Sequence, residues 1–315
     1  MGIGMDKPEV LMVGSGPDWY VERYARVFRL HRVPKADPAA LDPAVAQRVR
    51  AVIAAAPMPA TMIAALPALK IICNAGAGYE KVDVAAARAR GIIVTNTPGV
   101  TDGCVADMAM GLLLAAARHI VRGDRYARSG AWSKAAYPLV PRVFGKRMGI
   151  LGLGNIGLTI ARRAAAFDMK VSYHSRRQRA DVALPYHPTL PALAAASDYL
   201  IVACPGGDAT RHIVDAAVLK ALGPKGYVVN ISRGSVIDEE ALIAALENGT
   251  IAGAGLDVLE HEPAVPPRLA ALDNVVIMPH RGGGTIETWE EVTDLINANL
   301  NAFFAGKPAL TPIPE

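Results

Sequence analysis

Residues 148–157, with the sequence MGILGLGNIG, decide the fold of this chain. An aliphatic strand pattern runs into a Gly-x-Gly-x-x-Gly sequence, and a helical pattern follows over residues 158–167. In this order Gly152 permits a tight turn, Gly154 lets a pyrophosphate approach the backbone, and Gly157 lets helix and strand pack closely. The N–H groups at the start of the helix also attract phosphate. The sequence therefore predicts a βαβ unit that binds a dinucleotide, rather than an ordinary glycine-rich turn.

Short aliphatic patterns alternate with Ala/Leu-rich helical patterns on both sides of this stretch, which predicts the α/β class with parallel sheets. Strands are expected near residues 10–13, 51–55, 70–73 and 92–94, and in a second series near 148–152, 171–174, 199–203, 226–230, 252–256 and 275–278. The pattern from Thr101 to Arg122 predicts one long helix with Ile120 on its apolar side. An irregular segment, Ser129 to Lys146, follows it.

The final helical pattern, from about Thr285 to Phe304, resembles no part of the second strand series. We expect this helix to return to the first domain. Two domains result: residues 1–100 together with 285–315, and an inserted dinucleotide-binding domain of residues 101–284.

Composition limits the classes of protein to which the chain can belong. Its 315 residues carry a net charge of only +4 with scattered arginines, so charge alone does not indicate nucleic acid. Cys73, Cys104 and Cys204 lack metal-ligand spacing, which favours a reducing compartment and no structural metal. The start, MGIGMDKPEV, lacks the features of a secretory signal, and prolines interrupt the uncharged stretch 51–69. We expect a cytoplasmic protein without a membrane segment.

The turn after the second strand of the dinucleotide unit bears on cofactor choice. A site selective for NAD presents an acidic residue to the ribose about 20 residues beyond the first glycine. This chain has Ser175, Arg176 and Arg177 there, and no Asp or Glu between residues 170 and 180. A hydroxyl and guanidinium groups suit a 2′-phosphate, which favours NADP(H). The alternative is that these arginines form a solvated loop.

Arg233, Glu262 and His280 each follow an expected strand of the second series. Taken singly, they could be a surface ion pair, a loop carboxylate and a structural hydrogen-bonding residue. Ligands bind at the carboxyl edge of an open parallel sheet, where residues distant in sequence converge. Their joint placement therefore favours a catalytic set.

Over nearly its whole length the chain resembles the D-isomer-specific 2-hydroxyacid dehydrogenases. The matching segments, in order, are NAGAGY at 74–79, NTPGV at 96–100, GLGNIG at 152–157, NISRG at 230–234, GLDV at 255–258, EP at 262–263 and PH at 279–280. Within that family it is most similar to NADPH-dependent glyoxylate and hydroxypyruvate reductases and to hydroxyphenylpyruvate reductases, partly through Pro205-Gly206-Gly207 and Ser175-Arg176-Arg177. The resemblance implies a substrate domain built from both chain ends.

The resemblance also implies roles for individual residues. His280 matches the family's acid/base histidine, Glu262 its carboxylate partner and Arg233 its substrate-binding arginine. Backbone N–H groups of Ala77 and Gly78 match a second cradle for the substrate carboxylate. Further residues assigned to the cofactor site, beside the three glycines, the Ser-Arg-Arg turn, Arg233 and His280, are Leu153, Asn155, Ile156, Cys204, Pro205, Ile231, Ser232, Asp257 and Gly282.

Three positions leave questions open. Glu80 stands where many members have Asp after the glycine loop, a change that we expect to be structural. Arg281 follows His280 where an aliphatic residue is common. The Arg281 side chain either attracts an extra acidic group of the substrate or points to solvent. Trp132 resembles a tryptophan that some reductases insert into a neighbouring subunit's active site, although a lone Trp in a loop often just packs.

The expected activity is NADPH-dependent reduction of small 2-oxo acids, glyoxylate or hydroxypyruvate first, to 2-hydroxy acids. Larger aromatic 2-oxo acids such as hydroxyphenylpyruvate are the nearest alternative. A non-catalytic NADP(H)-binding regulator is the alternative from another class. The long helix and the irregular segment, poorly suited to pack on their own domain, predict a homodimer.

Overall fold

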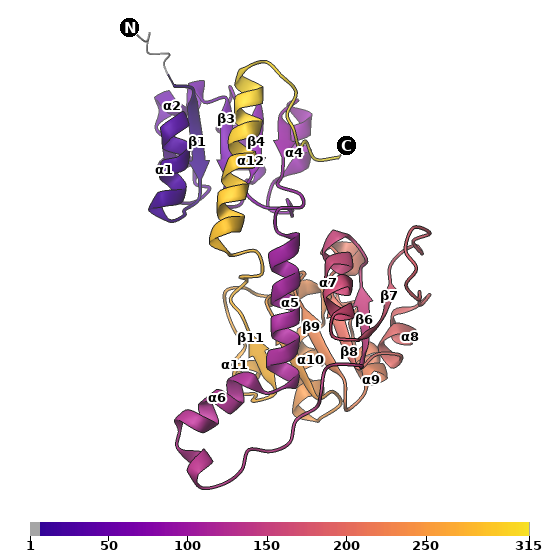
Figure 1. The fold of residues 1–315 in the computed structure, drawn as a ribbon. Coiled ribbons are helices and arrows are strands. Elements are labelled where there is room, and N and C mark those ends of the chain that lie inside the picture. Colours follow the sequence, from indigo (N-terminus) through magenta and orange to yellow (C-terminus); the bar gives the residue numbers. More distant parts are fainter. Residues whose placement is uncertain (1–6, 315) are drawn as a thin grey trace. The chain divides into compact units, whose positions relative to one another are not determined.

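A computed structural model describes residues 7–314, so the residues MGIGMD, on which the prediction about a secretory signal partly rests, lie outside the described range. The described chain divides into two units (Figure 1). Unit 1 contains the residues up to Thr101 and those from Thr285 onward, and unit 2 runs from Asp102 to Gly284. Both units have a parallel sheet with helices on its faces, so the predicted α/β class is confirmed.

Unit 1 has a five-stranded parallel sheet in the order β2-β1-β3-β4-β5. Its strands are β1 Glu9–Val13, β2 Arg29–Val33, β3 Ala51–Ala54, β4 Ile71–Asn74 and β5 Ile93–Thr95. Its helices are α1 Asp18–Val27, α2 Pro43–Arg48, α3 Ala60–Ala64, α4 Val84–Ala89 and α12 Ile286–Phe304, with a 3-10 turn at Pro38–Ala40. Helix α12 packs beside α1 and β4, which joins the end of the chain to its beginning.

Unit 2 has a six-stranded parallel sheet in the order β11-β10-β9-β8-β6-β7. Its strands are β6 Arg147–Leu151, β7 Lys170–His174, β8 Tyr199–Val202, β9 Tyr227–Asn230, β10 Gly253–Leu256 and β11 Val275–Ile277. Its helices are α5 Asp102–Ala117, α6 Ile120–Arg128, α7 Asn155–Ala165, α8 Leu190–Ala195, α9 Ala216–Leu222, α10 Glu239–Glu247 and α11 Pro267–Ala270. The 3-10 turns are Ala131–Ser133, Asp208–Thr210 and Gly234–Val236. Apolar side chains form a separate buried cluster on each face of this sheet.

The strand order of unit 2 reverses between β6 and β8, although all the strands are parallel. The chain runs outward from β6 to β7 and then returns to β8 on the other side of β6. In doubly wound sheets, ligands bind beyond the carboxyl ends of the strands at such a switch point. The loop after β6, which carries the three glycines, lies at this position.

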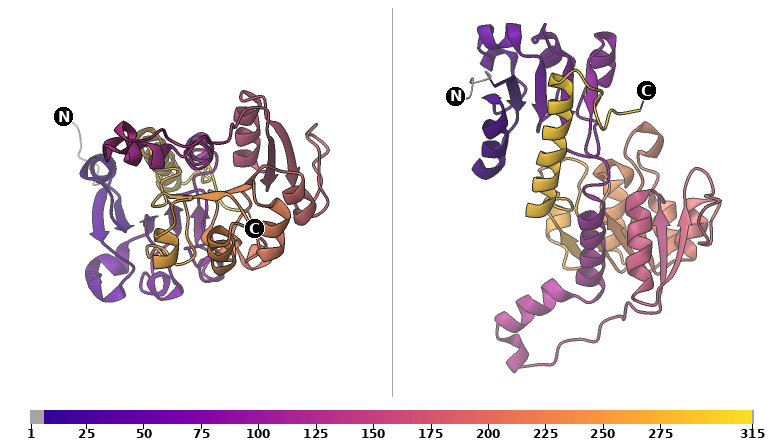
Figure 2. Two further views of the ribbon diagram at one scale, coloured as in Figure 1. Left: turned by 90° about the horizontal axis from the view of Figure 1, so that it is seen from below. Right: turned by 45° about the horizontal axis from the view of Figure 1, so that its top comes forward.

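The prediction of one long helix from Thr101 to Arg122 was wrong. The chain forms α5 and α6 instead, bent by 55° across the break between them. His119 takes a left-handed conformation with φ of 52°, which ends one helix and begins the other. Ile120, expected on the apolar side, is 54% exposed. Figure 2 shows α6 and the following segment standing away from the sheet of unit 2.

The apolar helix α5 lies in the core of unit 2, beside β9, β10 and α7. Within residues 7–314, no single helix is both long and apolar enough to cross a membrane, and only the bent pair α5 and α6 meets those two criteria together.

Candidate active site

The glycine-rich loop after β6 has the geometry that its sequence predicts. Gly152 has φ of 92°, and a Cβ there would lie 2.5 Å from the Cα of Cys204. A Cβ on Gly157 would lie 2.3 Å from the carbonyl oxygen of Gly152, so helix α7 packs directly on the turn. By contrast, a Cβ on Gly154 would meet nothing within 4 Å. The first and last glycines serve packing, and Gly154 faces open space.

These residues fit a dinucleotide phosphate. Helix α7 begins after Gly154 without a side-chain cap, so no side chain satisfies its first N–H groups. Leu153 lies in the loop, and Asn155 and Ile156 begin α7. A helix N-terminus with free N–H groups and no side chain in front of it is an anion site.

The turn after β7 is ordered by its own hydrogen bonds. Ser175 Oγ donates to the Arg177 carbonyl at 2.6 Å, and Tyr186 Oη donates to the Ser175 carbonyl at 3.2 Å. Arg176 and Arg177 are exposed, and no described residue forms an ion pair with either guanidinium. The hydroxyl therefore shapes the turn, while the two guanidinium groups remain available to a phosphate.

Arg179 ties this turn to the glycine-rich loop, and sequence analysis missed it. Its Nη1 donates to the carbonyl of Leu153 at 2.9 Å, and its backbone N–H donates to Tyr173 Oη at 2.8 Å. Asp181 accepts from its Nε at 3.0 Å, and this carboxylate raises the pKa of the Arg179 guanidinium. One partner is a backbone carbonyl 26 residues away, which no residue-type pattern reveals.

His280 and Glu262 form the pair that sequence analysis expected to converge. His280 Nδ1 lies 2.8 Å from Glu262 Oε2, and Glu262 Oε1 accepts the N–H of Leu259 at 3.1 Å. The His280 side chain is 44% exposed and its backbone φ is 55°. The carboxylate is thus fixed by the backbone, and it fixes one ring nitrogen and leaves Nε2 for another partner.

Asp257 holds the backbone that carries the histidine. Its carboxylate accepts the N–H groups of Arg281 at 2.7 Å and Gly282 at 2.8 Å, and its carbonyl accepts the N–H of His280 at 2.8 Å. A Cβ on Gly282 would lie 2.8 Å from Asp257 Oδ2, so a side chain there would displace the carboxylate that binds these N–H groups. Burial raises the pKa of the Asp257 carboxyl, and the two N–H groups oppose that shift. These contacts stabilise the left-handed turn at His280.

Arg233 follows β9, which is the neighbour of β10 in the sheet. Its carbonyl accepts from Asn230 Nδ2 at 3.0 Å, and its Nη1 donates to the Ser232 carbonyl at 2.7 Å. A Cβ on Gly206 would lie 2.6 Å from Arg233 Cγ. The absence of a side chain at Gly206 therefore leaves room for the Arg233 side chain in this position. Sequence analysis missed this contact between Gly206 and Arg233.

Ala77 and Gly78 lie in unit 1, in the loop that follows β4. Asn74 Nδ2 donates to the carbonyls of Gly76 at 2.9 Å and Gly78 at 3.0 Å, and Asn96 Nδ2 donates to that of Ala77 at 2.7 Å. Both asparagines stood inside recognised motifs, but no residue pattern indicated that their amides bind this loop.

The remaining residues predicted for the site differ in their burial. Cys204, Ile231 and Ser232 are buried, and Ser232 Oγ donates to the Cys204 carbonyl. Pro205 is exposed in the loop after β8, and Trp132, in the turn Ala131–Ser133, is 70% exposed. Across residues 7–314, no group of three or more His, Cys, Asp or Glu side chains is arranged to hold a metal ion.

The switch-point sheet, the open glycine-rich loop and an imidazole–carboxylate pair at the strand ends define a dinucleotide-dependent oxidoreductase. Comparison with known proteins narrows this class. Residues 110–282 match the model of the D-isomer specific 2-hydroxyacid dehydrogenase NAD binding domain. The chain belongs to the D-isomer specific 2-hydroxyacid dehydrogenase family, which confirms the resemblance seen in its sequence.

Individual relatives cover most of the chain. It is 48% identical over 267 residues to glyoxylate/hydroxypyruvate reductase A of Arabidopsis thaliana, covering 84% of this chain and 85% of the relative. It is 47% identical over 270 residues to hydroxyphenylpyruvate reductase of Plectranthus scutellarioides, and the aligned region covers 85% of this chain and 86% of that relative. A solved structure of an NADPH-dependent glyoxylate/hydroxypyruvate reductase from Sinorhizobium meliloti, in complex with NADP and malonate, has 43% identity and a TM-score of 0.92, covering 98% of this chain and 97% of that one.

Proposed function

We propose that this chain is a reductase of small 2-oxo acids that uses NADPH and takes glyoxylate or hydroxypyruvate as its first substrates. The observation that carries the proposal is the His280–Glu262 pair at 2.8 Å, placed beyond the strand ends of a dinucleotide-binding sheet. The activities of the Arabidopsis and Sinorhizobium relatives support the substrate class. In this proposal unit 1 is the substrate-binding domain.

The residues of unit 2 suit proton donation to a reacting carbonyl. When bound, the dinucleotide supplies the hydride. Negative charge then grows on the carbonyl oxygen, and a protonated imidazole aimed at that oxygen stabilises it and donates a proton. Since Nδ1 of His280 faces Glu262, Nε2 is the donor. Arg233 binds the substrate carboxylate, because a guanidinium forms paired hydrogen bonds with a carboxylate.

The preference for NADPH rests on the turn after β7. Arg176 and Arg177 are exposed and lack acidic partners among the described residues, and the turn contains no carboxylate that would repel a 2′-phosphate. Each charge-assisted contact to the phosphate is worth about 1.5 to 3 kcal/mol, or roughly tenfold or more in kcat/KM. Arg176→Ala should weaken NADPH chiefly and leave NADH nearly unchanged. Equal use of NADH and NADPH by the parent enzyme contradicts this part of the proposal.

The substrate is tested by following NADPH oxidation with glyoxylate, hydroxypyruvate and 4-hydroxyphenylpyruvate at matched concentrations. We expect the highest kcat/KM with one of the two small acids. The hydroxyphenylpyruvate reductase of Plectranthus is the observation that favours the aromatic acid as a second candidate. Binding of NADPH without oxidation in the presence of any 2-oxo acid would instead support a nucleotide-binding regulator.

We also propose a homodimer in a cytoplasmic, reducing compartment. The segment after α5 exposes apolar side chains that unit 2 does not cover, at Ile120, Trp132, Leu139 and Phe144. Closed twofold dimers are the commonest way to cover such a surface. The cysteines Cys73 and Cys204 are buried thiols that form no disulfide within residues 7–314, which is consistent with a reducing environment.

A further inference from the structure

The loop after β4 has an unusual arrangement of its peptide groups. Three successive carbonyls, those of Gly76, Ala77 and Gly78, accept hydrogen bonds from asparagine amides. Asn74, at the end of β4, is 7% exposed and serves two of them, one with each hydrogen of its amide. Asn96 serves the third from beyond β5.

The orientation of these carbonyls fixes the direction of the next three N–H groups. In a trans peptide the C=O of one residue and the N–H of the following residue point in opposite directions. Carbonyls that face Asn74 and Asn96 therefore turn the N–H groups of Ala77, Gly78 and Tyr79 away from the amides. In the part of the chain that the structure describes, no protein group accepts a hydrogen bond from these three N–H groups.

We propose that Asn74 is a positioning residue for substrate binding: its amide holds the Gly76 and Gly78 peptides so that the loop presents a row of N–H donors to the substrate carboxylate. This inference rests on the proposed 2-oxo acid reductase function. It assigns Asn74 a role through the backbone rather than through contact with substrate, and it adds the Tyr79 N–H to the two donors expected from the sequence.

The identity of the side chain matters in this arrangement. An amide donates two hydrogens, a serine hydroxyl donates one, and an ionised carboxylate of the same shape as the amide donates none and repels the carbonyl oxygens. A buried donor pair exchanged for a buried charge leaves both carbonyls unsatisfied. The peptides are then free to rotate, and the N–H row loses its direction.

The test compares Asn74→Asp, Asn74→Ser and Asn74→Ala with a matched control, Asn301→Asp, an exposed position on α12 in the same unit. KM and kcat are measured with glyoxylate, NADPH affinity by fluorescence titration, and oxalate binding to the NADP-loaded protein by calorimetry. At pH 7 we expect Asn74→Asp to raise KM and weaken oxalate about tenfold or more, with NADPH affinity unchanged. Asn74→Ser should be intermediate, and Asn301→Asp should match the parent.

A pH series separates positioning from a general loss of structure. Protonation of the carboxylate introduced by Asn74→Asp restores one donor, so oxalate binding by this variant should recover toward that of Asn74→Ser as pH falls, whereas Asn74→Ala should show no such recovery relative to the parent. Parent-like KM and oxalate affinity in Asn74→Asp would overturn the inference, and so would equal losses in all three variants with a lowered Tm. If Asn74→Asp does not fold, Asn74→Ser and Asn74→Ala decide by the same criteria.

The inference and the proposed function fail in different ways. A parent protein that reduces no 2-oxo acid refutes the proposed function. Calorimetry needs no turnover, so it would still measure the affinity of the loop after β4 for oxalate. A parent that reduces glyoxylate, together with an Asn74→Asp variant that binds oxalate normally, refutes only the role of Asn74.

Discussion

Gly206 shows how a missing side chain positions a charged one. A Cβ at this position would lie 2.6 Å from Arg233 Cγ and 3.0 Å from its Cβ, both near the root of the side chain. Arg233 Cγ can move away from the added methyl group only by rotation about the Cα–Cβ bond. That rotation puts the whole arginine side chain into a different rotamer. The guanidinium would then leave its place beside the Ser232 carbonyl.

We therefore expect Gly206→Ala to raise KM for glyoxylate and lower kcat, with kcat/KM falling about tenfold to a hundredfold. The same substitution in an Arg233→Ala background should add little, since the colliding Cγ is gone. Gly111→Ala, in α5 where a Cβ meets nothing within 4 Å, is the control. Steady-state kinetics of the four proteins form the double-mutant cycle, and strict additivity would count against the contact.

His280→Asn tests the proposed proton donor. Asparagine tolerates the left-handed conformation that His280 adopts at φ of 55°, so the turn should persist. We expect NADPH binding close to that of the parent and a kcat lower by roughly 10² to 10⁴, the range for loss of a positioned general acid. Glu262→Gln should be milder, because an amide still meets Nδ1 without its charge. Full 2-oxo acid reduction by His280→Asn would refute the assignment.

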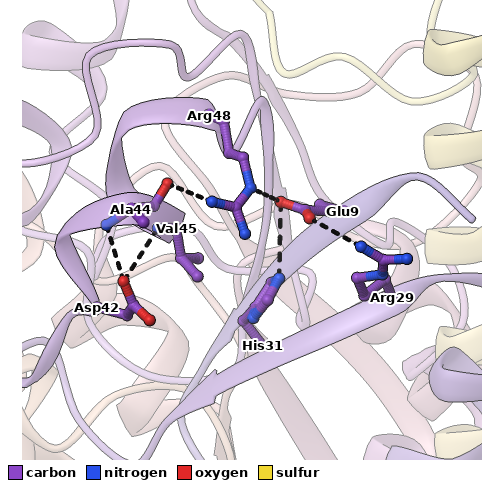
Figure 3. Close-up of polar contacts among 7 residues, drawn as sticks. All are labelled: Glu9, Arg29, His31, Asp42, Ala44, Val45 and Arg48. Carbon is purple, nitrogen blue, oxygen red and sulfur yellow. Dashed lines mark hydrogen bonds and ion pairs between the residues drawn. The ribbon is translucent and has the colours of Figure 1, made fainter.

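Glu9 makes the stability of unit 1 depend on pH. Figure 3 shows its carboxylate between Arg48 Nε at 2.7 Å, Arg29 Nη1 at 3.5 Å and His31 Nε2 at 3.7 Å. The hydrogen bond from Arg48 lowers the pKa of Glu9 below its ordinary value of 4.5 in the folded chain. A carboxyl with a lowered folded-state pKa stabilises the fold above its unfolded pKa, and that contribution is lost as pH falls through the folded value.

We expect Glu9→Gln to lower Tm by about 2–4 °C near pH 7, which corresponds to about 1 kcal/mol. The difference in Tm between Glu9→Gln and the parent should shrink as pH falls below 4.5. Differential scanning calorimetry from pH 3 to 8 measures both effects. A Tm difference that stays constant across this range would show that the charge of Glu9 does not contribute.

At the scale of elements, the strands of unit 2 could be predicted because fully buried parallel strands appear as short aliphatic runs between helical patterns. Strand β2, RLHRV, was missed, since three of its five side chains are polar and it lies at the sheet edge. The break at His119 was also missed, because neither Gly nor Pro marks it.

Parts of the candidate site could also be predicted. Residues that directly follow strands were found, namely His280, Arg233 and those of the glycine-rich loop. Residues that act on the backbone or on distant side chains left no residue-type signal of that role, namely Asn74, Gly206 and Arg179.

The link between the glycine-rich loop and the turn after β7 leads to a prediction about Arg179. Its bond to the Leu153 carbonyl orients the peptide whose N–H belongs to Gly154, within the phosphate loop. Arg179→Ala should therefore weaken NADPH and NADH alike, by about threefold to tenfold each. Arg268→Ala, on α11, removes the same charge from unit 2 at a residue whose printed partners are Glu240 and Glu247, and it is the control. A loss confined to NADPH would show that Arg179 contacts the 2′-phosphate directly instead.

At the scale of the whole molecule, two α/β units with separate cores leave one surface unexplained. The residues after α5 form α6, a short 3-10 turn and an irregular segment that stand away from the sheet of unit 2 (Figure 1). Leu139 in this segment is fully exposed, at 102%, and Phe144 is 55% exposed. Contiguous apolar surface is typical of interaction sites, and we propose that this segment forms the interface of a dimer.

A second copy of the chain is the partner that would cover this surface under twofold symmetry. We expect light scattering to give twice the 33.1 kDa mass of the chain at micromolar concentration. Leu139→Asp combined with Phe144→Asp should shift the mass toward 33.1 kDa, because a carboxylate cannot be buried unpaired at an interface. Leu310→Asp, equally apolar before substitution and 56% exposed in unit 1, should leave the mass unchanged. A parent mass near that of one chain would refute the dimer, and a dimer that survives the double substitution would place its interface elsewhere.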